Sequence, residues 1–329
     1  MFLSLLLSLL MPFRTIKCIM TTITTTTKNT FTRTWGIDVT IEEEDFPALY
    51  NSADSASLKA QSAYFNALKC YLMLLVIAAS VSFFYPADVY AAIASASLFL
   101  ITLGILVWIK VQKPEDTWYN GRAVAESVKT RTWRWVMKAK PYEADGPNQQ
   151  EQKEFLNDLK SILNQNRSLS HVLEWSPNLG EAVSEKMINV RSLPWEQRLE
   201  VYISDRIDNQ SHWYSMKSQL NKRLARQWFI VSIVLHSLAI LMLLYRIKEP
   251  STSLPVEVVA TAASAVLTWV QAKKHNELNS SYALAAHEIV LIKGESVSVT
   301  EERHLSEFVI NSESAFSREH TQWVARKSV

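Results

Sequence analysis

Four side chains with metal-binding chemistry fall within one short stretch: Asp205, Asp208, Asn209 and His212. Their spacing of three, four and seven residues from Asp205 places them on one face of a helix. Carboxylate, amide and imidazole groups of this kind bind divalent ions. The same pattern is also typical of a solvated face on which carboxylates pair with Arg206 and other basic residues. We favour the solvated face and predict no metal site.

Motifs for catalysis or nucleotide binding are absent from the sequence. It contains no GxGxxG, GxxxxGK[ST], GxSxG or HExxH, and its seven histidines are scattered. We therefore predict a protein that is not an enzyme, with no catalytic residues and no cofactor. The net charge of only +2 gives no reason to expect nucleic-acid binding. Cys18 and Cys70 form no disulfide framework and are predicted to be reduced thiols.

A polar stripe on an otherwise apolar helix is the most informative pattern. It consists of Glu257, Thr261, Ser264 and Thr268, which follow one another at four, three and four residues. Polar groups at membrane depth usually face a bundle interior or a water-filled path. Hydroxyl groups also bond to their own helix, and small residues allow close packing. The stripe is thus a candidate for pore lining or for helix packing, as are Ser95 and Thr102 on a milder stripe.

A third group of candidates lies just outside the apolar segments. Arg122 and Glu126 are four residues apart and can pair along a helix, which stabilises it by about 0.2–0.5 kcal/mol. Trp118 lies one turn earlier, and Tyr282 and Glu288 occur in a similar block. These five residues are predicted either to support their own helix or to contact another subunit beside the membrane.

Long apolar segments decide the fold class. A bilayer core about 30 Å thick needs roughly 20 apolar residues of helix. The first pair of spans is predicted at about 67–85 and 89–109, separated by a turn at Pro86 and Asp88. A second pair is predicted at about 228–245 and 256–271. The chain is therefore predicted to be an all-α integral membrane protein with two transmembrane helical hairpins and long juxtamembrane and cytoplasmic helices.

The two hairpins have similar flanks, which indicates a duplicated unit. Gln-Ser and two aromatic residues precede each hairpin, and a Tyr- and Ala-containing helix follows each one. The predicted organisation is a disordered or mis-annotated segment at 1–45, a first two-transmembrane domain at 46–142, a helical connector at 143–192, a second two-transmembrane domain at 193–293 and a polar tail at 294–329 with a short helix near 301–312. Residues 1–19 are expected to be a mis-assigned start; a signal or short anchor is the alternative.

Charge sets the predicted orientation. Lysine and arginine are abundant in 110–227 and absent from the first turn, so this region is predicted to be cytoplasmic. Both termini are then cytoplasmic, and the predicted location is the cell inner membrane.

Two blocks of sequence resemble a known family. The hairpin followed by WYNGRAVAESVKTRTWRW at 118–135 resembles the SLATT family, the SMODS- and SLOG-associating two-transmembrane effector domains. LPWEQRLEVYISDRIDNQSHWY, which begins at residue 193, resembles the opening of a second SLATT type, and YALAAHEI at 282–289 resembles its tail. The resemblance covers about 50–293 as two tandem copies, and the first 45 residues fit no part of it.

The resemblance implies a function that composition does not show. SLATT proteins are regarded as pore-forming or membrane-disrupting effectors of antiviral defence by cell suicide, often beside nucleotide-second-messenger synthetases. By this resemblance the expected partners are the lipid bilayer, further copies of the chain, and a nucleotide second messenger or sensor protein that acts through 151–227. The alternative is a non-catalytic membrane anchor or scaffold that recruits a partner through its cytoplasmic helices.

Overall fold

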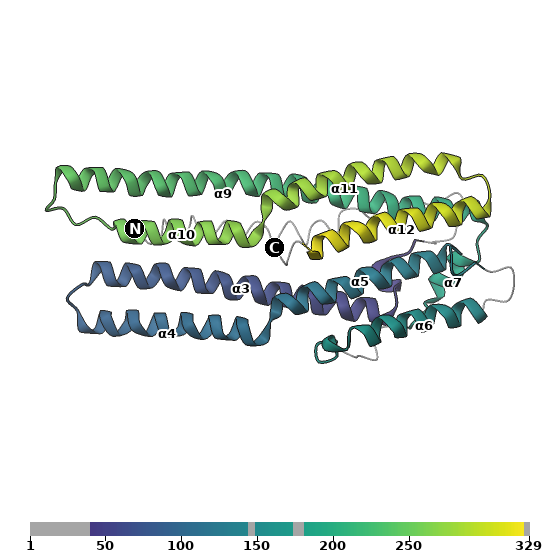
Figure 1. Ribbon diagram of the computed structural model, residues 1–329, viewed down its shortest axis with the longest axis horizontal. Coiled ribbons are helices and arrows are strands. Elements are labelled where there is room, and N and C mark those ends of the chain that lie inside the picture. The colour runs from purple at the N-terminus through teal and green to yellow at the C-terminus, as the bar shows by residue number, and fades with distance from the viewer. Residues whose placement is uncertain (1–39, 144–148, 174–180, 326–329) are drawn as a thin grey trace. The chain divides into compact units, whose positions relative to one another are not determined.

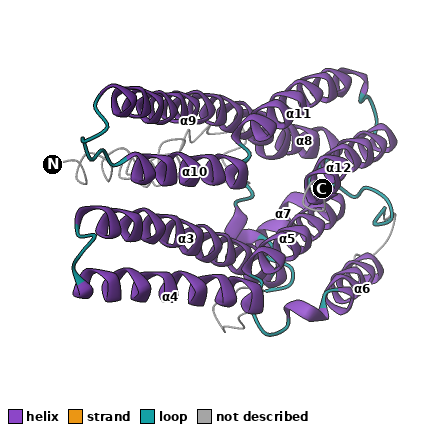
Figure 2. Cartoon of the chain, turned by 60° about the vertical axis from the view of Figure 1, so that its left-hand side comes forward, coloured by secondary structure: helices purple, strands orange, loops and turns teal. Residues whose placement is uncertain are grey.

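The computed structural model describes residues 40–143, 149–173 and 181–325, and all regular structure within them is helical. Figure 2 shows these residues as helices joined by short loops. This agrees with the predicted all-α class. The predictions for residues 1–39 lie outside the described residues.

The first hairpin is formed by α3 (Ala48–Phe84) and α4 (Val89–Gln112), which contain the first two predicted spans. Asp88 precedes α4, and its carboxylate accepts a hydrogen bond of 2.8 Å from the backbone N–H of Tyr90. This cap satisfies one of the free donors at the start of the helix. The second hairpin is formed by α9 (Asn209–Lys248) and α10 (Val256–Lys273), which contain the other two predicted spans.

Each hairpin ends in the same backbone feature. α4 stops at Lys113, which has a φ of 44°, and α5 (Pro114–Val136) begins at the next residue. In the second copy, α10 stops at Lys274, which has a φ of 49°, and α11 (His275–Glu295) follows directly. In both copies the new helix packs along the first helix of its own hairpin, α5 on α3 and α11 on α9. The predicted duplication is therefore visible in the backbone.

The described residues contain three helices that are long and apolar enough to cross a membrane, at Ala48–Phe84, Val89–Val136 and Trp195–Lys248. The third joins α8 (Trp195–Val201), a π-helix η3 (Tyr202–Asp208) and α9 into one continuous helix. α10 has 18 residues and is not one of the three. Its polar stripe lowers its hydropathy.

The helices of the two hairpins lie side by side in the order α4, α3, α10, α9. α3 packs against α4 and α10, and α10 packs against α9. Figures 1 and 2 show this row from two directions, with α4 and α9 at its two edges. A row of this kind has two broad faces and encloses no central channel.

The helices outside the row form a helical module at one of its ends. Besides α5, α8, η3 and α11, the module contains η1 (Glu43–Asp45), α6 (Gln149–Gln165), η2 (Arg167–Leu169), α7 (Glu185–Arg191), η4 (Ser296–Ser298) and α12 (Glu302–Ala325). α5 is central to the module, because it contacts α3, α6, α7 and α12. Its fully buried Trp133 and Trp135 contact the rings of Tyr202 and Phe155, at 5.7 and 5.5 Å between centroids.

Two parts of the module differ from the sequence-based expectation. The short helix expected within a polar tail is the 24-residue α12, whose Leu305 and Val309 are fully buried. Residues 40–45, assigned to the segment outside the fold, also belong to the module. Ile41 is buried and its N–H donates to Asp205 at 3.2 Å. These packing partners are distant in sequence, so local composition gave no sign of them.

Candidate functional site: the exposed polar face of α10

α10 buries its apolar side and exposes its polar side. The buried residues are Val256, Val258, Val259, Ala262, Ala263, Ala265, Val266 and Trp269. Glu257, Ser264 and Thr268 are exposed and Thr261 is partly exposed. We call these four residues the α10 polar face. The small buried side chains permit α10 to pack closely between α3 and α9.

Hydrogen bonds within the helix partly satisfy this face. The Thr261 hydroxyl donates to the Glu257 carbonyl at 2.8 Å, and the Thr268 hydroxyl donates to the Ser264 carbonyl at 2.9 Å. At the turn of the hairpin, the Glu257 carboxylate lies 3.6 Å from the Arg246 guanidinium, with both side chains more than half exposed. Back-bonding lowers the cost of a hydroxyl in an apolar medium, but the hydroxyl oxygens can still accept hydrogen bonds that such a medium does not supply.

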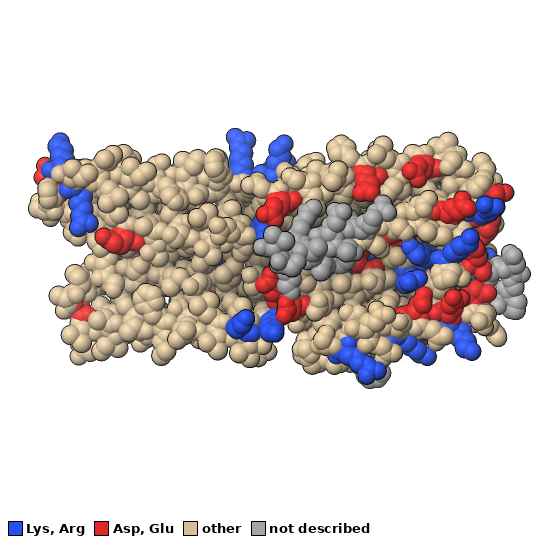
Figure 3. All heavy atoms as spheres, in the orientation of Figure 1, with Lys and Arg blue, Asp and Glu red and all other residues tan. Residues whose placement is uncertain are grey.

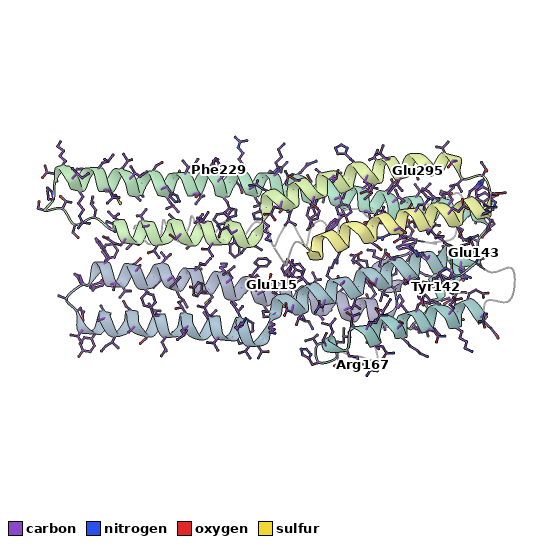
Figure 4. The ribbon with its side chains drawn as sticks, viewed as in Figure 1. Glu115, Tyr142, Glu143, Arg167, Phe229 and Glu295 are labelled. Carbon is purple, nitrogen blue, oxygen red and sulfur yellow. The ribbon has the colours of Figure 1, made fainter. Side chains whose placement is uncertain are left out.

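The other helices of the row present a different surface. The exposed side chains of α4 and α9 include large apolar residues such as Phe99, Phe229 and Leu241. Figure 4 places Phe229 on the part of α9 that belongs to the row. In Figure 3 charged atoms are sparse over the row and dense over the helical module. Exposed polar residues also occur on α4 and α9, such as Ser97 and His236, but α10 gathers four polar residues on one face of an 18-residue helix.

Ser95 and Thr102 lie elsewhere. Both are buried on α4, and the Ser95 hydroxyl lies 3.5 Å from the Ala78 carbonyl of α3. The Thr102 hydroxyl donates to the Phe99 carbonyl at 2.7 Å. The structure therefore places these two residues in the contact between α3 and α4, away from the α10 polar face.

Arg122 connects two helices beside the membrane. Its guanidinium lies 2.5 Å from Glu126 along α5 and 2.9 Å from Asp54 of α3. The predicted pair along the helix is present. The second partner was not predicted, and it belongs to the same chain.

Trp118 and Gly121 bring α5 close to α3. The Ser57 hydroxyl donates to the Trp118 carbonyl at 3.0 Å, and the Trp118 ring contacts Phe65 at 5.5 Å between centroids. A Cβ atom on Gly121 would lie 3.1 Å from the Ala53 carbonyl oxygen. The WYNGR block is therefore a packing motif in which glycine permits the close approach.

The second copy uses aromatic rings at the corresponding place. Tyr282 of α11 contacts Trp213 and Tyr214 of α9, with centroids 5.4 and 5.7 Å apart. Glu288 lies farther along α11 and is partly buried. Tyr282 thus connects α9 and α11 of one chain, as Trp118 connects α3 and α5.

The candidate metal ligands do not form a cluster. Asp205 accepts from the N–H of Ile41, whereas Asp208 pairs with Lys293 at 2.6 Å. The π-helix changes the spacing on which the one-face argument relied, since π turns do not follow the α-helical period. Among the described residues, no group of three His, Cys, Asp or Glu side chains is arranged to hold a metal ion.

One buried ionic network was missed by the sequence analysis. Arg206 and Glu313 are 1% and 0% exposed and form two hydrogen bonds of 2.8 Å. The Tyr202 and Thr130 hydroxyls also donate to Glu313, at 3.0 and 2.9 Å. Burial, together with the negative charge of Glu313, raises the pKa of Tyr202 well above its ordinary value. The network ties α12 to α5 and to the π-helix that leads into α9.

Two further buried arginines donate hydrogen bonds to backbone carbonyls at and after the C-terminal end of α5. Arg191 donates to the carbonyl oxygens of Trp135 and Tyr142, and Arg198 donates to that of Met137. Trp135 and Met137 lie at the C-terminal end of α5, where positive charge opposes the negative end of the helix dipole. Burial lowers the pKa of Arg191 to about 10, so it remains charged at neutral pH.

Comparison with known families assigns the two halves of the chain. "SMODS and SLOG-associating 2TM effector domain 3" matches residues 47–199, and "SMODS and SLOG-associating 2TM effector domain 1" matches residues 202–323. The chain belongs to the SLATT family. No curated protein and no solved structure matches it. Together with the apolar helices, the two tandem SLATT matches make this a membrane protein with an effector role.

The SLATT matches reach farther than the domains drawn from sequence, which ended at residues 142 and 293. The first includes α6 and α7, and the second includes α12. The boundary between them falls where α8 meets the π-helix. Because α12 of the second SLATT domain packs on α5 of the first, the two domains share one core.

Proposed function

We propose that this SLATT protein is a defence effector whose copies assemble in the inner membrane and permeabilise it. The observation that supports this proposal most directly is the α10 polar face. A helix beside lipid is expected to expose apolar side chains, whereas α10 exposes Glu257, Ser264 and Thr268 beside Ala260 and Leu267. Assembly with the polar faces directed toward a shared axis would remove them from lipid and surround a hydrated path.

The row of helices makes several copies necessary for this function. α4 and α9 lie at opposite edges of the row, so one chain cannot close around a path. A closed ring of copies places the same helix of each chain at its axis. α10 is the suitable helix, because the exposed faces of α4 and α9 are largely apolar.

The proposed orientation places the helical module in the cytoplasm. Exposed basic residues occur where the spans meet the module, among them Lys110, Lys113, Lys222, Arg223 and Arg226. Lysine and arginine near span ends favour the cytoplasmic side. Ile41 and α12 both lie in the module, so the described chain begins and ends on that side. A nucleotide second messenger or sensor protein would act on the module from the cytoplasm.

Membrane potential during induced expression tests the proposal. The test variant is Thr261→Leu, Ser264→Leu and Thr268→Leu together, which makes three of the four residues of the α10 polar face apolar. A matched control replaces Ser97 of α4, exposed and bonded to its own helix at 2.8 Å, by leucine. We expect depolarisation by the wild type and by the control, and loss of depolarisation by the triple variant at equal membrane abundance.

Two results would contradict the proposal. Depolarisation by the triple variant at the wild-type rate would show that permeabilisation does not depend on the polar residues of α10. Purified protein that stays monomeric in liposomes and releases no ions with any candidate trigger would contradict the effector function itself. In that case the alternative, a scaffold that recruits a partner through the module, would account for the family membership.

A further inference from the structure

A stripe of large apolar side chains covers the outer side of α11, outside the membrane. The α11 stripe consists of Leu284, Val290, Leu291 and Val297, the last in the short helix that follows. Leu284, Leu291 and Val297 are 68%, 72% and 87% exposed. Single exposed apolar residues are ordinary, but a group of neighbouring ones is typical of a contact surface.

The stripe lies opposite the side by which α11 joins its own chain. Ala285, Ile289 and Ile292 are buried and belong to the side that packs on α9. At 100° per residue, Leu284 and Leu291 project from the other side. Gly294 occupies that side as well, and a Cβ added there would meet nothing within 4 Å. The described residues thus leave the stripe open to a partner.

In the proposed orientation the α11 stripe lies outside the lipid, because α11 leads from α10 into the helical module along α9. At its start, His275 bonds to Asn221 of α9 at 2.8 Å. Near its end, Lys293 pairs with Asp208, the last residue of the π-helix η3 that leads into α9. With a rise of 1.5 Å per residue, Leu291 lies about 25 Å along α11 from Lys274. Figure 4 labels Glu295 at the end of α11, far from the hairpin turns.

We infer that the occupant of the α11 stripe is a second copy of this chain. The α10 polar face and the α11 stripe belong to consecutive helices joined by the single residue Lys274. The proposed ring, which places α10 of every copy at its axis, also brings together the α11 helices that continue from α10. This inference rests on the proposed function and extends its interface. In such an assembly the α10 polar face lines the shared path, and the α11 stripe supplies an apolar contact between copies outside the membrane.

Cross-linking at one position of the stripe tests this directly. Cys18→Ser and Cys70→Ser provide a background without thiols, into which Leu291→Cys is introduced. Leu163→Cys is the matched control, because Leu163 is a 43% exposed leucine on α6. A bismaleimide is applied to membranes that contain the full-length protein. We expect a multimer ladder from Leu291→Cys that is several-fold stronger than that from Leu163→Cys.

A second pair of variants reports on assembly without thiols. Leu284→Ser with Leu291→Ser is compared with Leu163→Ser by native electrophoresis in mild detergent. We expect the stripe variant to lose its multimers and to keep the thermal midpoint of the wild-type monomer. Leu291→Arg is expected to act in the same way through charge repulsion between copies.

The outcomes separate this inference from the proposed function. Multimers that persist in the stripe variants, or equal cross-linking at residues 291 and 163, would overturn the inference. Neither result would contradict the proposed permeabilisation of the membrane. Cross-linking of residue 291 to a different protein would overturn it also. Multimers that depend on the stripe but never depolarise a membrane would support the inference and contradict the proposed function.

Discussion

Arg206 and Glu313 form a bidentate ion pair within the core that both SLATT domains share, with both nitrogen–oxygen distances at 2.8 Å. Neither side chain reaches solvent, and they are 107 residues apart in the sequence. A buried pair of this kind adds little net stability relative to an apolar pair, but removal of one partner leaves an uncompensated charge. The pair therefore fixes how α12 sits against the π-helix.

Replacement of Glu313 by alanine tests how much this ion pair contributes to the stability of the fold. We expect Glu313→Ala to lower the free energy of unfolding by about 3–5 kcal/mol, because the Arg206 charge would remain buried without a partner. Thermal unfolding of the full chain in detergent measures the change. Glu307→Ala is the matched control on α12, where an exposed pair with Arg303 accounts for only about 0.2–0.5 kcal/mol. Similar losses in both variants would show that the ion pair is not important.

Gly121 permits the close packing of α5 on α3. Alanine at 121 would improve helix propensity, but its Cβ would approach the Ala53 backbone oxygen to 3.1 Å and Ser57 Cβ to 3.2 Å. We expect Gly121→Ala to lower stability by about 1–3 kcal/mol, as overpacking does. Gly104→Ala is the control, since nothing lies within 4 Å of its added Cβ. Chemical denaturation measures both variants. If Gly121→Ala is more stable than Gly104→Ala, the close approach of α5 to α3 does not require glycine at this position.

The left-handed residue that ends α4 predicts a stabilising substitution. Lys113 has a φ of 44°, which lies in the left-handed region. This conformation costs a residue with a Cβ atom about 1–2 kcal/mol, whereas glycine adopts it without that cost. We expect Lys113→Gly to raise the thermal midpoint, with a gain of about 1 kcal/mol. Lys110→Gly, inside α4, should instead cost about 1 kcal/mol. The prediction is wrong if the two glycines change the midpoint in the same direction.

His275 makes the contact between α9 and α11 sensitive to acid. Burial, with a contribution from Lys273, lowers the pKa of His275 to about 4. Because an unfolded histidine has a pKa of about 6.5, its contribution to stability is intact above pH 6.5 and declines as the pH falls toward 4. We expect a loss of about 1–2 kcal/mol between pH 7 and pH 5.

Melting curves at these two pH values measure the effect of His275. His275→Gln retains a polar side chain that cannot titrate, and it should reduce the difference between the two curves. An unchanged difference would assign the acid sensitivity to other groups.

The hairpins could be predicted from sequence because their signals are local. Uncharged runs near the thickness of a bilayer, separated by Pro86 and Asp88, specify helices and a turn without knowledge of distant residues. Helical spacing also identified the α10 stripe and the pairing of Arg122 with Glu126. Both patterns depend only on positions three and four residues apart.

Contacts over long sequence distances decided the rest. Glu313 lies in a region that composition describes as polar, and its burial depends on Arg206, Tyr202 and Thr130 from other helices. The sequence likewise determined that α10 has a polar side. Only the tertiary structure decided that this side faces outward, because α3 and α9 both pack against the small apolar residues of the other side. Helical periodicity specifies which residues share a face, whereas the neighbour of that face is set by packing between distant segments.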